Sequence, residues 1–178
     1  HLGSPEQVGR GLYGALIVEE ASPPAVDRDL VWVLSDWRLD REARMVEDFG
    51  NFMDASHAGR IGNTVTINGA IRDFLEVRAG ERIRLRLVNA SNARIYGLKF
   101  DGHVPHVIAL DGHAVEPHPV PGGRAVLGPG QRVDLILDCT GKQGASYRVI
   151  DEFYARRAYR LIDLRYTGEP SYARARPP

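Results

Sequence analysis

Four histidines, His103, His106, His113 and His118, lie within one sixteen-residue stretch of this sequence. Imidazole is a common protein ligand for zinc and copper, so the stretch raises the hypothesis of a metal site. The spacing argues against it, because two residues three positions apart on a strand, such as His103 and His106, face opposite sides of the sheet. We expect surface or hydrogen-bonded histidines here and keep copper ligation as the alternative.

Arg82, Arg84 and Arg86 alternate with aliphatic residues, so their guanidinium groups are expected on one face of a strand. Such a row of cations can bind an anion. It can also pair across a sheet with carboxylates such as Asp134 or Asp138, whose segment alternates in the same way. We expect this second arrangement, a salt-bridged outer face. Surface pairs of this kind contribute about 0–1 kcal/mol each and help to set the strand register.

The single cysteine, Cys139, has no Lys, Arg or His within two residues. Nearby cations are what lower a thiol pKa, so we expect a packed side chain and not a reactive thiol. A copper site of the His₂Cys type also needs imidazoles near the thiolate and usually an axial methionine. No histidine follows Cys139, and both methionines, Met45 and Met53, lie far upstream. No site of that type is encoded in this chain.

Short strand patterns and Gly/Pro turns position these residues. The strand signals recur along most of the chain, at residues 12–19, 29–38, 74–78, 82–87, 133–137, 147–150 and 159–166. Helical periodicity is weak, with one short candidate at residues 41–49 that fits a loop equally well. About ten short strands separated by turns predict an all-β fold, a two-sheet Greek-key sandwich.

The long irregular segment from Glu47 to Asn63 has two readings. Connections of this length are uncommon in a compact domain unless they are functional or pack on a neighbour. The segment either lines a substrate pocket or is a packing insertion, and the sequence favours neither.

Composition excludes several classes of protein. The 178 residues suffice for one domain plus tails, and 23 Lys and Arg balance 23 Asp and Glu. Without a basic surplus there is no electrostatic case for binding nucleic acid or an anionic membrane. No apolar run approaches the roughly 20 residues that span a bilayer. A single cysteine excludes an internal disulfide and leaves the redox compartment open.

An ordered series of motifs carries a family resemblance. Asn68-Gly69 comes first, followed by Gly80 with the alternating strand that ends in Asn89-Ala90-Ser91, then Gly102-His103 with Asp111-Gly112, and finally Pro129 to Asp134. The series resembles the second, cupredoxin-like domain of three-domain multicopper oxidases of the laccase and copper-efflux oxidase group. Before it, His1 and the strand-like Gly11 to Glu19 resemble the end of the first domain. The resemblance implies boundaries at residues 1–21 (end of the first domain), 22–168 (second domain) and 169–178 (a linker toward a third domain).

By this resemblance His1 is the second histidine of a His-x-His pair that ligates a trinuclear copper cluster. Its partner would lie two residues upstream, and the family's other histidine motifs do not occur in this sequence. The resemblance therefore implies copper in the full-length parent and none bound by this chain, which contains no catalytic or other cofactor-binding residue. The parent would oxidise phenols or metal ions, reduce O₂ to water and be periplasmic or secreted. This chain alone would be inactive, a scaffold between the first and third cupredoxin domains.

Two alternatives remain open. The family includes a periplasmic cell-division protein that keeps the fold without the copper ligands, a reading that His1 mildly opposes. A free amino group at His1 would instead allow a copper brace similar to that of the lytic polysaccharide monooxygenases.

The apolar residues 12–19 add an expectation about partners. If they form the last strand of another sheet, that strand is left without its neighbours. It should then dock on the sandwich edge or pair between chains, because an exposed apolar edge strand is a site of self-association.

Overall fold

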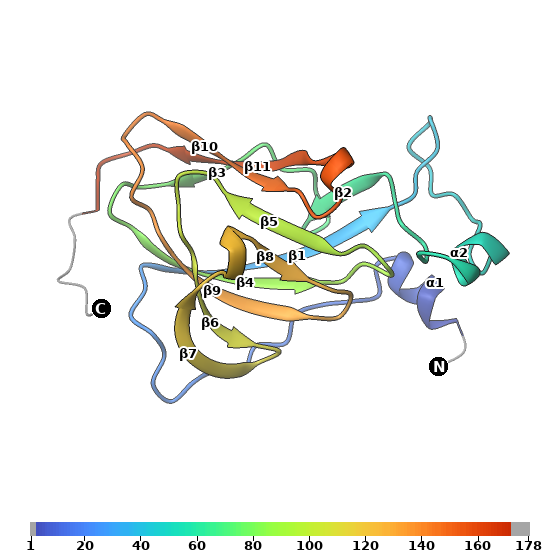
Figure 1. Cartoon of the computed structure of the whole chain (residues 1–178), viewed down its shortest axis with the longest axis horizontal. Coiled ribbons are helices and arrows are strands. Elements are labelled where there is room, and N and C mark those ends of the chain that lie inside the picture. The colour runs from blue at the N-terminus through green and yellow to red at the C-terminus, as the bar shows by residue number, and fades with distance from the viewer. Residues whose placement is uncertain (1–2, 172–178) are drawn as a thin grey trace.

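Alternating aliphatic side chains pack two β-sheets face to face. The computed structural model describes residues 3–171, apart from the side chain of residue 155, and shows an all-β, cupredoxin-like Greek-key sandwich (Figure 1). Its strands are β1 (Arg28–Trp37), β2 (Thr64–Ile67), β3 (Phe74–Val77), β4 (Arg82–Asn89), β5 (Tyr96–Phe100), β6 (His106–Leu110), β7 (His113–Pro119), β8 (Ala125–Leu127), β9 (Arg132–Asp138), β10 (Ser146–Asp151) and β11 (Tyr159–Tyr166). The helical elements are α1 (Ser4–Gly9), α2 (Phe52–Ser56) and the 3₁₀ turns η1 (Pro121–Gly123) and η2 (Ala155–Arg157).

One sheet has the strand order β2-β1-β4-β9-β6-β7 and the other the order β3-β11-β10-β5-β8. Both sheets are mixed, because β1 runs parallel to β4 and β3 runs parallel to β11. Sequence neighbours such as β4 and β5 lie in different sheets, so the chain crosses repeatedly between the layers. α1 and α2 lie together at one end of the sandwich (Figure 1). Within residues 3–171, no helix is long and apolar enough to cross a membrane.

The core comes from the inward faces of both sheets. Leu85 of β4 and Leu135 of β9 are cross-strand partners and are buried in the interior. Leu98 and Leu164 are buried from the opposite sheet. Burying each such leucine contributes about 1.5–3 kcal/mol relative to leaving it in water, so this alternation is the main source of stability.

Most of the predicted strands are confirmed. The segments 29–38, 74–78, 82–87, 133–137, 147–150 and 159–166 correspond to β1, β3, β4, β9, β10 and β11.

One sequence-based prediction is wrong and one open alternative is decided. Residues 12–19 form no strand, because residues 14–19 have no backbone hydrogen-bond partner in the described structure. Residues 41–49, which fitted a helix or a loop equally well, form a loop: Asp40 accepts backbone and side-chain hydrogen bonds from Arg44 in a tight turn, and Ala43 adopts a positive φ of 59°. The short α2 begins later, where the Asn51 side chain accepts a hydrogen bond from the Asp54 backbone amide.

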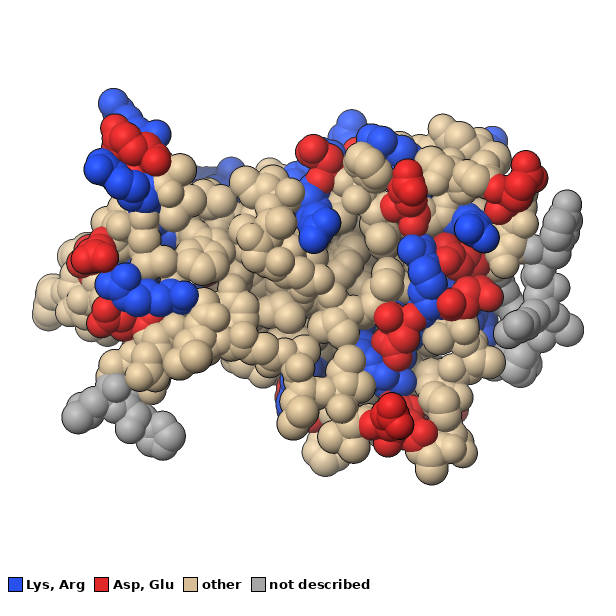
Figure 2. Space-filling view, turned by 180° about the vertical axis from the view of Figure 1, so that it is seen from behind, with Lys and Arg blue, Asp and Glu red and all other residues tan. Residues whose placement is uncertain are grey.

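The arginine row of β4 pairs with carboxylates as expected. Arg82 forms two hydrogen bonds with Asp138, and Arg86 pairs with Asp29 of β1. Arg84 pairs with Asp134 of β9, with 2.5 Å between Nη2 and Oδ2. Figure 2 shows acidic and basic side chains side by side on one face of the molecule, with no large area of a single sign.

Arg84, however, does not lie on an open surface. Its side chain is only 4% exposed, because residues 14–26, which form no strand, run across this face and Glu20 places Oε1 2.6 Å from Arg84 Nη2. At the other end of the segment, the Tyr13 hydroxyl donates a hydrogen bond to Ser35 Oγ of β1. The expectation of a purely surface ladder is therefore wrong at Arg84, because a segment with no strand pairing covers it.

Burial should make the Arg84–Asp134 pair more sensitive than its neighbour. We predict that Asp134→Ala lowers the free energy of unfolding by about 3 kcal/mol, since it leaves a buried guanidinium short of a partner. Asp138→Ala removes the carboxylate of the more exposed Arg82 and should cost about 0–1 kcal/mol. Urea denaturation of both variants and the wild type measures the difference. Equal losses would show that the covering segment does not bury Arg84 in solution.

Candidate functional site

The described structure does not gather the four candidate histidines into a site. On the β6–β7 hairpin, His106 lies opposite Pro119, while His113 lies opposite Leu110 and His118 opposite Val107. His103 precedes β6, so the strand-spacing argument does not apply to it. Within residues 3–171, no three His, Cys, Asp or Glu side chains are grouped so that they could hold a metal ion. His1 lies outside the described residues.

His103 has no free nitrogen with which to bind a metal. Its Nδ1 lies 2.8 Å from the Asp101 carbonyl oxygen, which can only accept, so Nδ1 carries the proton and donates it. Nε2 is then the acceptor for the Tyr166 hydroxyl, at 2.5 Å. Both nitrogens are occupied, and His103 is a structural residue that connects the 101–103 turn to β11.

Cys139 lies in the same buried cluster. The Cys139 side chain lies beside that of Tyr166, and the Tyr147 ring packs edge-on against both His103 and Tyr166. Burial raises the pKa of the Cys139 thiol to about 12, and Glu81 acts in the same direction. The cluster therefore keeps a neutral thiol, and a metal ligand or nucleophile would need the thiolate. The donor set of the described residues does not fit a copper site of the His₂Cys type.

The long segment 47–63 packs against the beginning of the chain. The Phe49 ring lies between two guanidinium groups, with Arg60 at 4.0 Å and Arg10 of the α1 C-cap at 5.3 Å from the ring centroid. Gly9 sits so close to this ring that a Cβ there would lie 2.5 Å from it, so only glycine fits. Phe49 thus packs as one of the two readings of this segment expects, whereas Phe52 on α2 is 79% exposed and is not a core residue.

The last residues of the same segment are held on β1 by a buried ion pair. Asp36 accepts hydrogen bonds from the Gly62 amide, at 2.5 Å, and from Arg94 Nε, at 3.1 Å. Arg94 also donates to the Gly62 carbonyl oxygen at 2.8 Å. Nothing in the sequence predicts this contact, because Asp36 and Arg94 are far apart in the chain and no pattern links them.

A protein-family model and solved structures of known proteins match this chain. A family model described as multicopper oxidase matches residues 28–160. A multicopper oxidase structure from Pseudomonas thermotolerans is 33% identical with a TM-score of 0.82, covering 94% of this chain and 40% of that one. A second, from Pseudomonas parafulva, is 32% identical with a TM-score of 0.81, covering all of this chain and 43% of that one.

A curated relative with a different name also matches this chain. The cell division protein FtsP of Sodalis glossinidius is 34% identical over 145 residues, which are 78% of this chain and 30% of that protein. The chain thus spans less than half the length of the relatives that it matches.

Burial of His103 should make folding depend on pH. Desolvation lowers the pKa of its imidazole below the ordinary value of 6.5, against the opposing effect of the Asp101 carbonyl. As pH falls through about 6.5 the unfolded chain therefore takes up a proton that the folded chain does not. We predict that the free energy of unfolding falls in this window, by at most about 1.4 kcal/mol per pH unit.

Denaturation between pH 7.5 and 5.5 tests this prediction. His103→Gln should remove the dependence, and His113→Gln, which alters an exposed histidine, should keep it. The same slope in His103→Gln and the wild type would refute the assignment.

Proposed function

Because this chain belongs to the multicopper oxidase family, we propose that it is the copper-free middle domain of a longer protein, a scaffold between neighbouring cupredoxin-like domains. In this proposal residues 22–168 are the second domain, residues 1–21 are the end of the first, and residues 169–178 lead toward a third. Residues 1–2 and 172–178 lie outside the described structure. The parent's activity is the oxidation of phenols or metal ions with reduction of O₂ to water, at copper centres in the other domains, in the periplasm or outside the cell.

The observation that carries the proposal is the exposed apolar segment after α1. Leu12, Leu16 and Val18 are 70%, 92% and 77% exposed. Within the described structure, residues 14–26 form no backbone hydrogen bond. A run of exposed aliphatic side chains with an unpaired backbone is a surface that another part of a protein covers.

The contacts that hold this segment on the sheet favour a neighbouring domain that covers its apolar side. They do not favour docking of that apolar side on the sandwich itself. Tyr13 and Glu20 attach the segment to Ser35 and Arg84 near its two ends. The polar anchors face the sheet while Leu16 and Val18 face solvent. A segment that completed this sandwich would bury its apolar side chains against it. The arrangement therefore suits a preceding domain that receives the apolar side.

The curated relative supports a second candidate function. Because a cell division protein shares 34% identity over 78% of this chain, the parent can instead be a non-catalytic member of the family. The domain would have the same scaffold role in both cases. Copper-binding histidines in the remainder of the parent would decide between them, since the oxidase needs a complete set and the non-catalytic protein does not.

We predict that the exposed segment makes this chain self-associate when no other domain covers it. Light scattering at rising protein concentration should show an increasing mean mass for the wild type and a constant, monomeric mass for Leu16→Asp. A charge at this position opposes burial of the apolar surface.

Val104→Asp is the matched control, because Val104 is an exposed aliphatic residue, at 66%, that belongs to the loop between β5 and β6 and not to this segment. It should associate like the wild type. A wild type that stays monomeric at all concentrations, or loss of association in Val104→Asp alone, would contradict the role assigned to residues 12–19.

A further inference from the structure

A hollow of about 800 Å³ lies between two parts of the chain. The end of segment 47–63 and the first two residues of β2 line one side, and η2 and the start of β11 line the other. This volume is within the range of small-molecule sites in proteins, about 300–1,000 Å³. Neither the family resemblance nor the scaffold role accounts for it. Aliphatic side chains of Ile61, Val65 and Leu161 line it, together with Tyr154 and Tyr159.

The charged side chains that line the hollow are all basic. Four arginines line the hollow, Arg94, Arg156, Arg157 and Arg160, and no Asp or Glu is among the described lining residues. The chain as a whole has equal numbers of acidic and basic residues, so this local surplus does not follow from composition.

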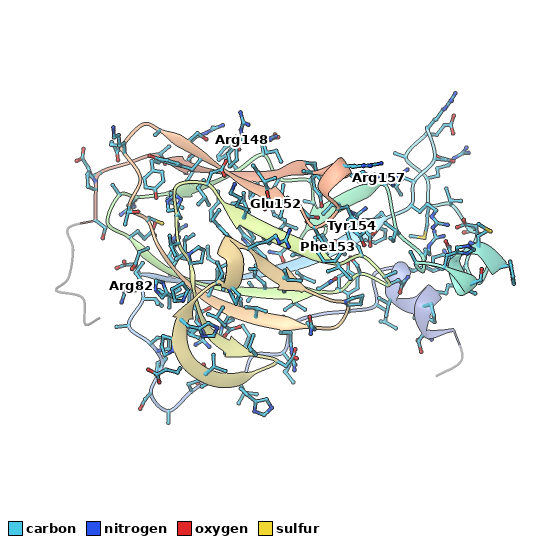
Figure 3. The ribbon with its side chains drawn as sticks, in the orientation of Figure 1. Arg82, Arg148, Glu152, Phe153, Tyr154 and Arg157 are labelled. Atoms are coloured by element: carbon cyan, nitrogen blue, oxygen red, sulfur yellow. The ribbon has the colours of Figure 1, made fainter. Side chains whose placement is uncertain are left out.

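Two of these cations are already paired. Arg94 forms the ion pair with Asp36, whose side chain is 1% exposed, and Arg160 pairs with Asp73 and Asp163. No ion pair or side-chain hydrogen bond joins Arg156 or Arg157 to any described residue. These two guanidinium groups remain available to an anion. Figure 3 shows Arg157 at η2, on the same side of the sandwich as Tyr154.

Hydrogen bonds within the protein hold the two tyrosine rings that line the hollow. The Tyr159 hydroxyl donates a hydrogen bond to Asp151 Oδ2 at 2.9 Å, and the Tyr154 hydroxyl accepts one from the Ile95 amide at 3.4 Å. Both rings therefore have defined positions. The guanidinium carbon of Arg94 lies 5.9 Å from the Tyr154 ring centroid, so a cation also lies over that ring. Rigid aromatic and aliphatic walls reduce the entropy that binding would cost.

We propose that this hollow binds a small aromatic carboxylate. Its ring would contact Tyr154 and the aliphatic wall, and its carboxylate would accept hydrogen bonds from Arg156 and Arg157. A guanidinium group matches a carboxylate in geometry, because its parallel N–H donors can reach both oxygens. An apolar wall with a few convergent polar groups is the usual composition of a small-molecule site. Inorganic anions would use the arginines without the apolar wall, so the hollow favours an anion with an apolar body.

The probe for this site is 2-naphthoate, titrated into the 178-residue chain by calorimetry. Its neutral control is 2-naphthalenemethanol, which has the same ring system and no charge. We expect saturable binding of the carboxylate and at least fivefold weaker binding of the alcohol. Exposed charge pairs contribute up to about 1 kcal/mol each, so Arg157→Gln should weaken binding about threefold to fivefold. Arg156→Gln/Arg157→Gln should weaken it about tenfold or more.

Arg148→Gln is the matched control for the loss of one positive charge. Arg148 is an exposed residue of β10 that does not line the hollow, and Figure 3 shows it well separated from Arg157. This variant should bind 2-naphthoate like the wild type. Equal affinity for the alcohol and the carboxylate, equal weakening by Arg148→Gln and Arg157→Gln, or no saturable binding at all would overturn the proposal. Thermal unfolding of each variant confirms that a loss of binding is not a loss of fold.

Discussion

The buried guanidinium group of Arg84 is the constraint on which much of this structure depends. A charge with 4% exposure is tolerable only if carboxylates satisfy it, and these come from two places. Asp134 comes from β9, which lies next to β4 in the sheet, so the pair also holds the β4–β9 register. Glu20 comes from the segment after α1. The segment must therefore cross the outer face of the sheet, and its apolar residues Leu16 and Val18 are left in solvent.

The sandwich itself was predictable from the sequence because its signal is local. Alternation in segments such as 82–87 and 133–137 defines which face is buried without reference to any other part of the chain. The pairing of the β4 arginines with Asp134 and Asp138 followed from two adjacent alternating strands. The family resemblance came from motifs at turns, such as Asn68-Gly69, where both residues adopt positive φ.

What the sequence did not reveal depends on contacts between distant residues. The strand expected at 12–19 fails because a compact apolar run favours a strand but does not supply the neighbouring strand that it must pair with. The contact of Asp36 with Arg94 and Gly62 joins three separate segments, and no sequence pattern links them to one another. The sequence left open a pocket beside segment 47–63, but the arginines of the hollow at η2 were not anticipated, since they come from two stretches of chain and look like ordinary surface residues. The number of histidines alone did not show whether they bind a metal. The two hydrogen bonds of His103 show that both of its ring nitrogens are occupied.

The most direct test of the central claim, a family domain that carries no complete copper site, is the copper content of this chain. Cu(II) loading followed by exhaustive dialysis and elemental analysis measures it, in the wild type and in His1→Ala. The account predicts well below one copper per chain in both. One copper per chain would contradict it. Loss of that copper in His1→Ala would assign it to His1, and its retention would assign it to the histidines between His103 and His118.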